Sequence, residues 1–317
     1  MGQYVIRRLL WFIPVLFLVS VIIFVIMRVL PGDPVIAALG GEASVGLKQE
    51  QIDRIRQQLG LDRSLVVQYK EWAWGMLRLD PGVSLRTRQP VGDDIRRKLP
   101  LTLELTLASV IIGMVFAIPI GVISAVRRNS IFDYVLRLIS GFGLAIPSFF
   151  LGTLIIIFLV RQFTWLPPLG YKQFWVDPIK NIAQIMIPAS ILGFILTAFM
   201  SRMTRSQMLE VVRQDYIRTA WSKGLRERTV IIRHALKNAI IPVVTLSGVL
   251  FATLLSGTVI MEDLFSVPGI GQGLATGVRE RDYTMVQAIV VLYAVMILVV
   301  NLLVDLTYAW LDPRIRY

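Results

Sequence analysis

Hydrophobic residues in this 317-residue chain gather in six long runs, separated from one another by polar segments. A helix needs about 20 mostly apolar residues to cross a bilayer, and the runs are close to that length or longer. They predict six transmembrane helices, at Leu9–Leu30, Leu105–Val126, Val135–Val160, about Ile182–Met200, Ala239–Met261 and Thr284–Tyr308. The pattern therefore predicts an all-α membrane protein.

Small residues occur in and around these runs at places where helices would approach closely. Membrane helices use small side chains at their contacts because these let two backbones come near each other. We expect such contacts at Gly141, Gly143, Gly152, Gly193, Ser247, Gly248, Ser256 and Gly257.

The composition agrees with a membrane protein, since 55% of residues are hydrophobic and only 17% are charged. The formal net charge is +12, which in a soluble domain would suggest nucleic acid. Membrane proteins collect Lys and Arg in their cytoplasmic loops, so we expect a lipid bilayer and no nucleic acid as the partner. The absence of cysteine excludes disulfides and cysteine-ligated metals, and a single histidine, His234, argues against a histidine metal site.

The distribution of basic residues predicts the orientation in the membrane. Arg7 and Arg8 precede the first run, which we interpret as an uncleaved anchor with a cytoplasmic N-terminus. Segment 201–238 carries nine basic residues against three acidic ones and would also be cytoplasmic. Alternation then places residues 127–134 and the C-terminus inside, and residues 31–104, 161–181 and 262–283 outside. We expect a multi-pass protein of the cytoplasmic (inner) membrane.

The outer loop 31–104 is the one predicted connection long enough to form a small subdomain. It contains two amphipathic pieces, residues 48–60 and residues 64–77 (SLVVQYKEWAWGML). They are compatible with a lid packed on the outer membrane surface and with a docking platform for a soluble partner.

Several kinds of chemistry are missing from the sequence. The central thirds of the six runs contain no Asp, Glu, Lys, Arg or His, which argues against transport driven by protons or sodium. The chain has no HExxH or GxSxG motif, so we do not expect an enzyme. It also lacks the GxxxxGK[ST] loop that binds ATP phosphates. Energy for any pumping would have to come from another polypeptide.

A polar segment at 215–242 (DYIRTAWSKGLRERTVIIRHALKNAIIP) is the natural place for such a partner to bind. We expect a two-turn helix with Asp215 as N-cap and Gly224 just beyond its end. Its face of Tyr216, Ile217, Ala220 and Trp221 needs a covering surface, because so short a helix is marginal alone. A second helix, from about Arg226 to Asn238, would lead into the fifth span. The segment would lie on anionic lipid headgroups or, as its sequence favours, dock a protein.

This segment resembles the conserved loop of bacterial ABC-importer permeases, in which EAA is followed by three residues and Gly. Aligned on Gly224, the chain has Arg218, Thr219 and Ala220, so only the second Ala and the Gly match. Two segments, DYIRTA-x-x-KGL and HALKNAIIPVVT, instead resemble sequences of the dipeptide/oligopeptide/nickel subfamily. Further segments resemble that subfamily along the whole chain: LPGDP (30–34), SIFDY (130–134), RMTRSQMLEV (202–211), FSVPGIGQ (265–272), RDY (281–283), NLLVDLTY (301–308) and DPRIR (312–316).

The resemblance implies a fold and a set of partners. The fold would be the six-helix type I ABC importer permease fold with a long extracytoplasmic loop after the first helix, as in the B-type permease. Residues 1–30 would be the tail and first helix, 31–104 the loop subdomain, and 105–317 a five-helix core containing the coupling segment 201–238. The partners would be a second homologous permease, two ATP-binding-cassette ATPase subunits that carry ATP and Mg, and an extracytoplasmic solute-binding protein.

The resemblance also implies roles for particular residues. The short helix would insert into a groove on the ATPase and couple ATP hydrolysis to the spans through Asp215, Tyr216, Ile217, Arg218, Thr219, Ala220, Trp221 and Gly224. On the outside, the sequence itself predicts a re-entrant turn formed by Pro268, Gly269, Gly271 and Gly273. That turn would seal an outer gate or reach toward the receptor, where Glu262 or Asp263 would meet ligand or receptor.

We therefore expect an importer permease for di- or oligopeptides, without catalytic residues, metal or cofactor of its own. The same machinery could carry nickel, glutathione or oligosaccharide, since the runs do not distinguish among these solutes. The alternative from a different functional class is a channel that works without ATPase subunits, or a structural membrane protein.

Overall fold

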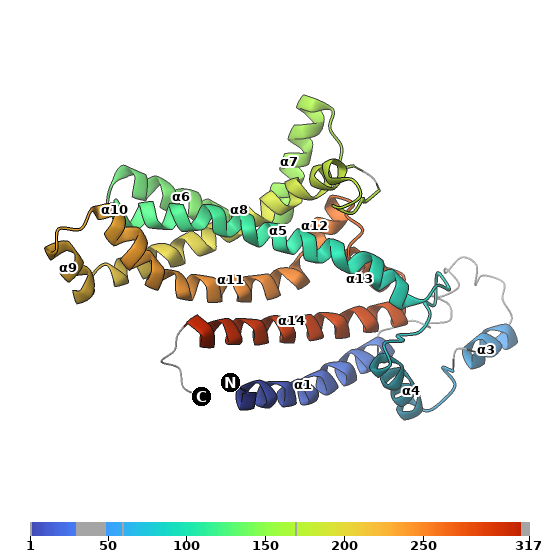
Figure 1. Cartoon of the computed structure of the whole chain (residues 1–317). Coiled ribbons are helices and arrows are strands. Elements are labelled where there is room, and N and C mark those ends of the chain that lie inside the picture. Colours follow the sequence, from blue (N-terminus) through green and yellow to red (C-terminus); the bar gives the residue numbers. More distant parts are fainter. Residues whose placement is uncertain (1, 30–48, 59, 169, 312–317) are drawn as a thin grey trace. The chain divides into compact units, whose positions relative to one another are not determined.

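The computed structural model describes residues 2–29, 49–58, 60–168 and 170–311 (Figure 1). Within these residues the regular structure is helical, apart from an isolated bridge between Val83 and Pro90. Five described helices are long and apolar enough to cross a membrane, and a bent helix pair brings the number to six if it counts as one span. The all-α prediction is confirmed. The LPGDP and DPRIR segments lie outside the described residues.

The chain begins with the long helix α1 (Gly2–Val29), followed by the two short helices α3 (Gln49–Gln58) and α4 (Leu65–Leu77). The remaining helices are α5 (Val91–Val126), α6 (Ile131–Ala145), α7 (Ser148–Phe163), α8 (Pro178–Val211), α9 (Asp215–Ser222), α10 (Glu227–Thr229), the π-helix η2 (Val230–Leu236), α11 (Lys237–Gly257), α12 (Val259–Leu264), α13 (Ile270–Arg279) and α14 (Tyr283–Leu311). Because α5 begins at Val91, the final part of the predicted loop 31–104 is helical.

The third predicted span is not one continuous helix. It breaks between α6 and α7, whose axes differ in direction by 99°. Ile146 adopts an extended conformation at the break, with φ −90° and ψ 122°, and Pro147 follows it. The proline ring disfavours helical geometry at the preceding residue, which explains the position of the break. The span predicted over Val135–Val160 is therefore a bent pair of helices with its break at Pro147.

The chain forms two compact units. The first comprises Met1–Thr102 and Pro268–Val299. Its core packs Ile23 and Met27 of α1 against Tyr283 and Val286 of α14. The Asp282 carboxylate accepts hydrogen bonds from the Ser84 hydroxyl and from the Met285 backbone N–H. The first of these bonds attaches the segment before α5 to the start of α14.

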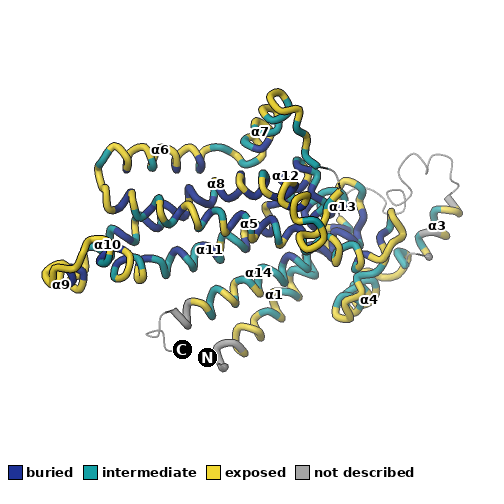
Figure 2. The backbone as a smooth tube through the Cα atoms, turned by 45° about the horizontal axis from the view of Figure 1, so that its top comes forward, coloured by how far each residue is buried: buried dark blue, intermediate teal, exposed yellow. Residues whose placement is uncertain are grey.

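The second unit comprises Leu103–Val267 and Val300–Tyr317. One of its clusters joins Val110 and Ala117 of α5 to Leu196 and Met200 of α8. Buried positions recur along α8, whereas α6 and the end of the unit that carries α9 are mostly exposed (Figure 2).

Close approach of helices in this unit explains part of the small-residue pattern. A Cβ atom on Gly193 would lie 2.6 Å from the Ile112 Cγ2 atom, so α5 and α8 need glycine there. Similar crowding confirms the predicted contacts at Gly143, Gly152 and Gly248. The prediction is wrong for Gly141 and Gly257, where an added Cβ would have no heavy atom within 4 Å.

Candidate functional site

The predicted polar helix exists as α9, but its first residues have different roles from those expected. Gln214 is the N-cap, with φ −70° and ψ 149°, and Asp215 lies inside the first turn. Asp215 forms an ion pair with Arg218 across 3.5 Å. A carboxylate in the first turn is favourable because the helix N-terminus carries partial positive charge. The prediction of Asp215 as N-cap is wrong.

Gly224 ends the helix as the sequence predicts. Its φ is +72°, a left-handed conformation that glycine adopts without steric cost. The Gly224 N–H donates to the Trp221 carbonyl at 2.9 Å, and the Leu225 N–H donates to the Ala220 carbonyl at 3.4 Å. These two bonds form a Schellman motif, which satisfies carbonyls at the end of α9 and turns the chain toward α10.

One side of α9 is buried against its own chain. Ile217 has 0% relative exposure and Ala220 is also buried. They belong to an apolar group that we call the α9 cluster, whose buried members are Ala125, Met208, Ile217, Ala220, Val230, Ile231, Ala235 and Ala239. The cluster connects α9 to the end of α5, the end of α8, η2 and α11. The expectation that Ile217 and Ala220 belong to a docking face is therefore wrong, because this chain already covers them.

The edges of this buried face and the opposite side of α9 face solvent. Tyr216 is 45% exposed and Trp221 is 42% exposed, although both are large aromatic side chains. Arg218 and Thr219 are exposed between them. The Tyr216 hydroxyl accepts a hydrogen bond of 2.8 Å from the Asn238 side-chain amide, which fixes its orientation. Of the predicted contact residues, Tyr216, Arg218 and Trp221 offer large side chains to a partner.

The helix after α9 does not stop where the sequence suggests. α10, η2 and α11 follow one another without a break from Glu227 to Gly257, through Pro242. The π-helical stretch places Val230 and Ala235, five residues apart, together in the α9 cluster. An α-helix would rotate such a pair apart by about 140°, so the wider turn serves the packing of α9.

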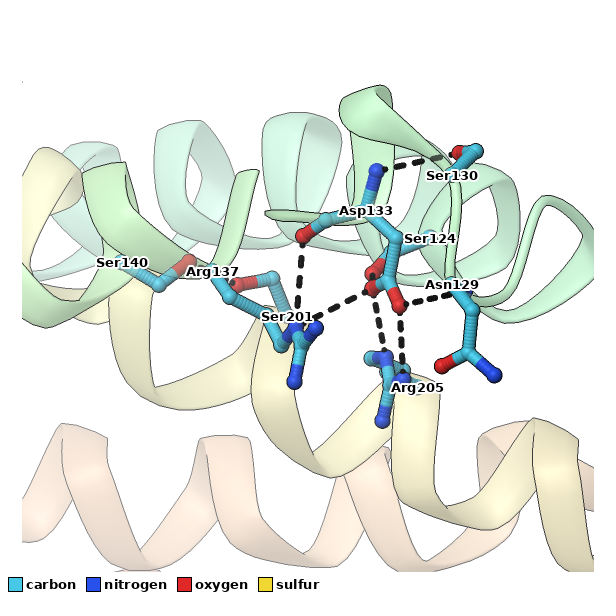
Figure 3. Close-up of polar contacts among 8 residues, drawn as sticks. All are labelled: Ser124, Asn129, Ser130, Asp133, Arg137, Ser140, Ser201 and Arg205. Carbon is cyan, nitrogen blue, oxygen red and sulfur yellow. Dashed lines mark hydrogen bonds and ion pairs between the residues drawn. The ribbon is translucent and has the colours of Figure 1, made fainter. Parts of the chain in front are cut away.

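A buried ion pair joins α6 to α8 (Figure 3). The Arg205 guanidinium of α8 contacts the Asp133 carboxylate of α6 through two hydrogen bonds of 2.9 Å each. The same carboxylate, whose side chain has 0% exposure, accepts bonds from the Ser124 hydroxyl and from the Asn129 backbone N–H. A further cation, Arg137, lies 3.5 Å away.

We call these groups the Asp133 clamp, because one carboxylate holds α5, α6 and α8 together. Ser124 precedes Ala125 of the α9 cluster, and Arg205 lies about one helical turn before Met208 of the same cluster. No sequence motif predicts a role for the clamp. Its available signals were a lone aspartate at the start of an apolar run and an arginine at the end of another.

The predicted outer site is divided among three elements. Glu262 lies in α12 with 0% exposure and accepts a hydrogen bond of 2.9 Å from the Thr258 hydroxyl. It therefore does not face solvent, whereas Asp263 does. Gly269 is the N-cap of α13, so Gly271 lies within that helix and is buried. The turn is thus shorter than predicted and reaches only to Pro268 and Gly269.

Comparisons with known proteins give one consistent result. A family model described as the inner membrane component of binding-protein-dependent transport systems matches residues 117–317. A second model, for the N-terminal part of such membrane components, matches residues 1–106. A putative peptide transport system permease protein of Brucella abortus (strain 2308) is 38% identical over the full length of both chains. The glutathione transport system permease protein GsiC of Escherichia coli (strain K12) is 39% identical, also over both full lengths.

Solved structures agree on the fold. The MetNI methionine ABC transporter, in inward facing conformations, matches with a TM-score of 0.55 and 18% identity, over 69% of this chain and 96% of that one. An amino acid ABC transporter crystallised with histidines matches with a TM-score of 0.53 and 18% identity, over 69% of this chain and 94% of that one. These matches confirm the predicted importer-permease fold.

Proposed function

Because the chain belongs to the family of inner membrane components of binding-protein-dependent transport systems, we propose that it forms a pathway for short peptides together with a second, homologous permease. As a member of this family it is a multi-pass inner-membrane transport subunit and not an enzyme. It needs no cofactor, since the ATPase of such a system is a separate chain. It works with that ATPase and with a solute-binding protein.

The substrate proposal rests on one observation, the full-length similarity to relatives that are named for peptide and for glutathione transport. Glutathione is itself a tripeptide, so a pathway for short peptides agrees with both names. We propose di- and oligopeptides as the main class, with glutathione as the first alternative to test.

We propose that α9 couples ATP hydrolysis on the ATPase to transport. Its exposed Tyr216, Arg218 and Trp221 would contact a groove on the ATPase, and two such ATPase subunits would serve the two permeases. The α9 cluster supports this assignment because it joins α9 to the ends of α5, α8 and α11. A displacement of α9 by the ATPase would move these helices with it, since closely packed apolar interiors transmit strain.

The proposed orientation follows the basic residues. The N- and C-termini and segment 201–238 would be cytoplasmic, and residues 31–104 would be extracytoplasmic. The solute-binding protein would then dock on the side that carries residues 31–104. Segment 262–271 would serve as part of the outer gate, with the buried Glu262 as a structural group and the exposed Asp263 as a candidate contact.

Reconstitution tests the proposed function. The chain is expressed with its partner subunits, placed in lipid vesicles, and supplied with the binding protein and labelled dipeptide, tripeptide or glutathione. We expect uptake that requires both ATP inside and the binding protein outside. Uptake without nucleotide would indicate a channel, and the absence of uptake for every peptide, with activity for nickel or oligosaccharide, would overturn the substrate class.

A further inference from the structure

The short helix α4 has a largely apolar outward face for a segment in a polar loop, with one exposed lysine, Lys70, within it. None of the residues of α4 is buried by the chain. Val66 is 63% exposed and Leu77 is 77% exposed, and Val67 and Trp74 are exposed on the same side of the helix. An exposed apolar face of this kind marks a contact with a protein or a membrane.

The inward face of α4 packs along α1, a predicted transmembrane helix. The Tyr69 ring makes edge contacts with Phe17 and Phe24, with ring centres 6.4 Å and 5.3 Å away. Its hydroxyl lies 2.8 Å from the Ser20 hydroxyl. Trp72 adds a second aromatic contact with Phe24, at 5.9 Å.

These contacts fix how deep α4 lies along α1. The helix rises about 1.5 Å per residue, so Ser20 lies about 13 Å below the end of α1 at Val29. The apolar span of α1 covers residues Ile6–Val29. Since the hydrocarbon core is about 30 Å thick, a side chain that contacts Ser20 and Phe17 reaches well inside one leaflet. Apolar side chains of α1, such as Phe17 and Val25, are also exposed along this stretch.

Polar groups on and near α4 suit the boundary of a bilayer. Arg28 of α1 donates a 3.0 Å hydrogen bond to the Gln68 side chain and stacks 4.1 Å from the Phe24 ring centre. Glu71 is paired with Arg63, which precedes the helix. Arg78 lies 4.9 Å from the Trp74 ring centre at the other end. Paired charges, a long Lys70 able to extend toward water, and tryptophan are typical of the interface.

We propose that α4 lies in the leaflet nearest the C-terminal end of α1, with Val66, Val67, Trp74 and Leu77 in contact with phospholipid acyl chains. In lipid, every backbone N–H and C=O group must be hydrogen-bonded within the protein. An α-helix such as α4 meets this condition with its own backbone hydrogen bonds. A soluble docking partner would find this face covered by lipid. The assignment is independent of what the protein transports.

Spin labels on single cysteines test the proposal in the full chain, purified with its co-purifying subunits in phospholipid nanodiscs. The chain has no native cysteine, so the unmodified protein reports the background labelling. Labels are placed at Val66→Cys and Leu77→Cys. Val25→Cys on the exposed face of α1 is the lipid reference, and Gln57→Cys on the polar helix α3 is the water reference. Power saturation compares access of oxygen, which enters lipid, with access of a water-soluble nickel chelate.

At positions 66 and 77 we expect an oxygen-to-nickel access ratio similar to that at position 25 and several-fold higher than that at position 57. Nickel access equal to that at position 57 would overturn the proposal and place α4 in water, as a docking platform requires. Low access for both reagents would also overturn it, because the face would then be covered by protein. Each labelled variant must elute with the same subunits as the unmodified chain.

Discussion

Replacing Asp133 or Arg205 of the Asp133 clamp should destabilise the protein strongly. The loss of stability should be larger for Arg205→Ala than for Asp133→Ala. Arg205→Ala leaves a carboxylate with 0% exposure that keeps the Ser124 and Asn129 donors and the Arg137 cation at 3.5 Å, but loses both 2.9 Å guanidinium bonds. Breaking a buried ion pair in this way costs about 3–5 kcal/mol. Asp133→Ala leaves an arginine that is 20% exposed and can turn toward water, so its cost should lie near the lower limit of that range.

The midpoint of thermal unfolding, measured on each purified variant, gives the difference in stability between Arg205→Ala and Asp133→Ala. A loss of about 3 kcal/mol lowers the midpoint by roughly 4–5 °C in a chain of this size. Arg202→Ala is the matched control, because Arg202 is an exposed arginine on the same helix. The double variant should lose less stability than the sum of the two single losses, since the two side chains interact directly. Additive losses, or a midpoint for Arg205→Ala equal to that of Arg202→Ala, would mean that the buried ion pair does not stabilise the protein.

The remaining predictions concern α9 and the helix contacts of the second unit. Ile217→Ala should cost about 2–4 kcal/mol, because it opens a cavity in the α9 cluster, whereas Trp221→Ala should leave the unfolding midpoint near that of the parent. Equal midpoints for these two variants would contradict the burial of Ile217. Gly121→Val should reduce the amount of folded protein recovered from membranes, because a Cβ there would lie 2.5 Å from the Thr204 Cβ atom. Gly141→Ala is the control, because an added Cβ at Gly141 would have no heavy atom within 4 Å. Equal recovery of the two would mean that α5 can move away from α8. Trp221→Ala should also lower transport per ATP hydrolysed without changing the amount of permease in the membrane, and unchanged coupling would argue against α9 as the point of ATPase contact.

The sequence predicted the positions of the helices better than it predicted what covers them. Apolar run length located the spans because membrane thickness sets that length. It missed the break at Pro147, since an apolar run reads the same whether its helix is straight or bent. On α9, helical periodicity correctly placed Tyr216, Ile217, Ala220 and Trp221 on one face. Only the structure reveals that the centre of that face is buried and its two edges are exposed.

The Asp133 clamp shows a second limit of sequence analysis. Asp133 and Arg205 are 72 positions apart, and neither stands in a motif with a defined chemistry. Their pairing depends on how α6 packs against α8, which no local pattern determines. Glu262 is a similar case, because its burial depends on the packing of α12 and was not visible in the polar character of the segment.

Photo-crosslinking from position 221 tests whether α9 binds the ATPase. A benzophenone amino acid replaces Trp221 in the assembled complex, and in a separate control it replaces Phe158. Phe158 is also an exposed aromatic residue, but it lies on α7, away from α9 in both views (Figures 1 and 2). If α9 binds the ATPase, position 221 should form an adduct with the ATP-binding-cassette subunit and position 158 should form none. A complex that hydrolyses ATP but gives only lipid adducts at position 221 would contradict binding of the ATPase by α9.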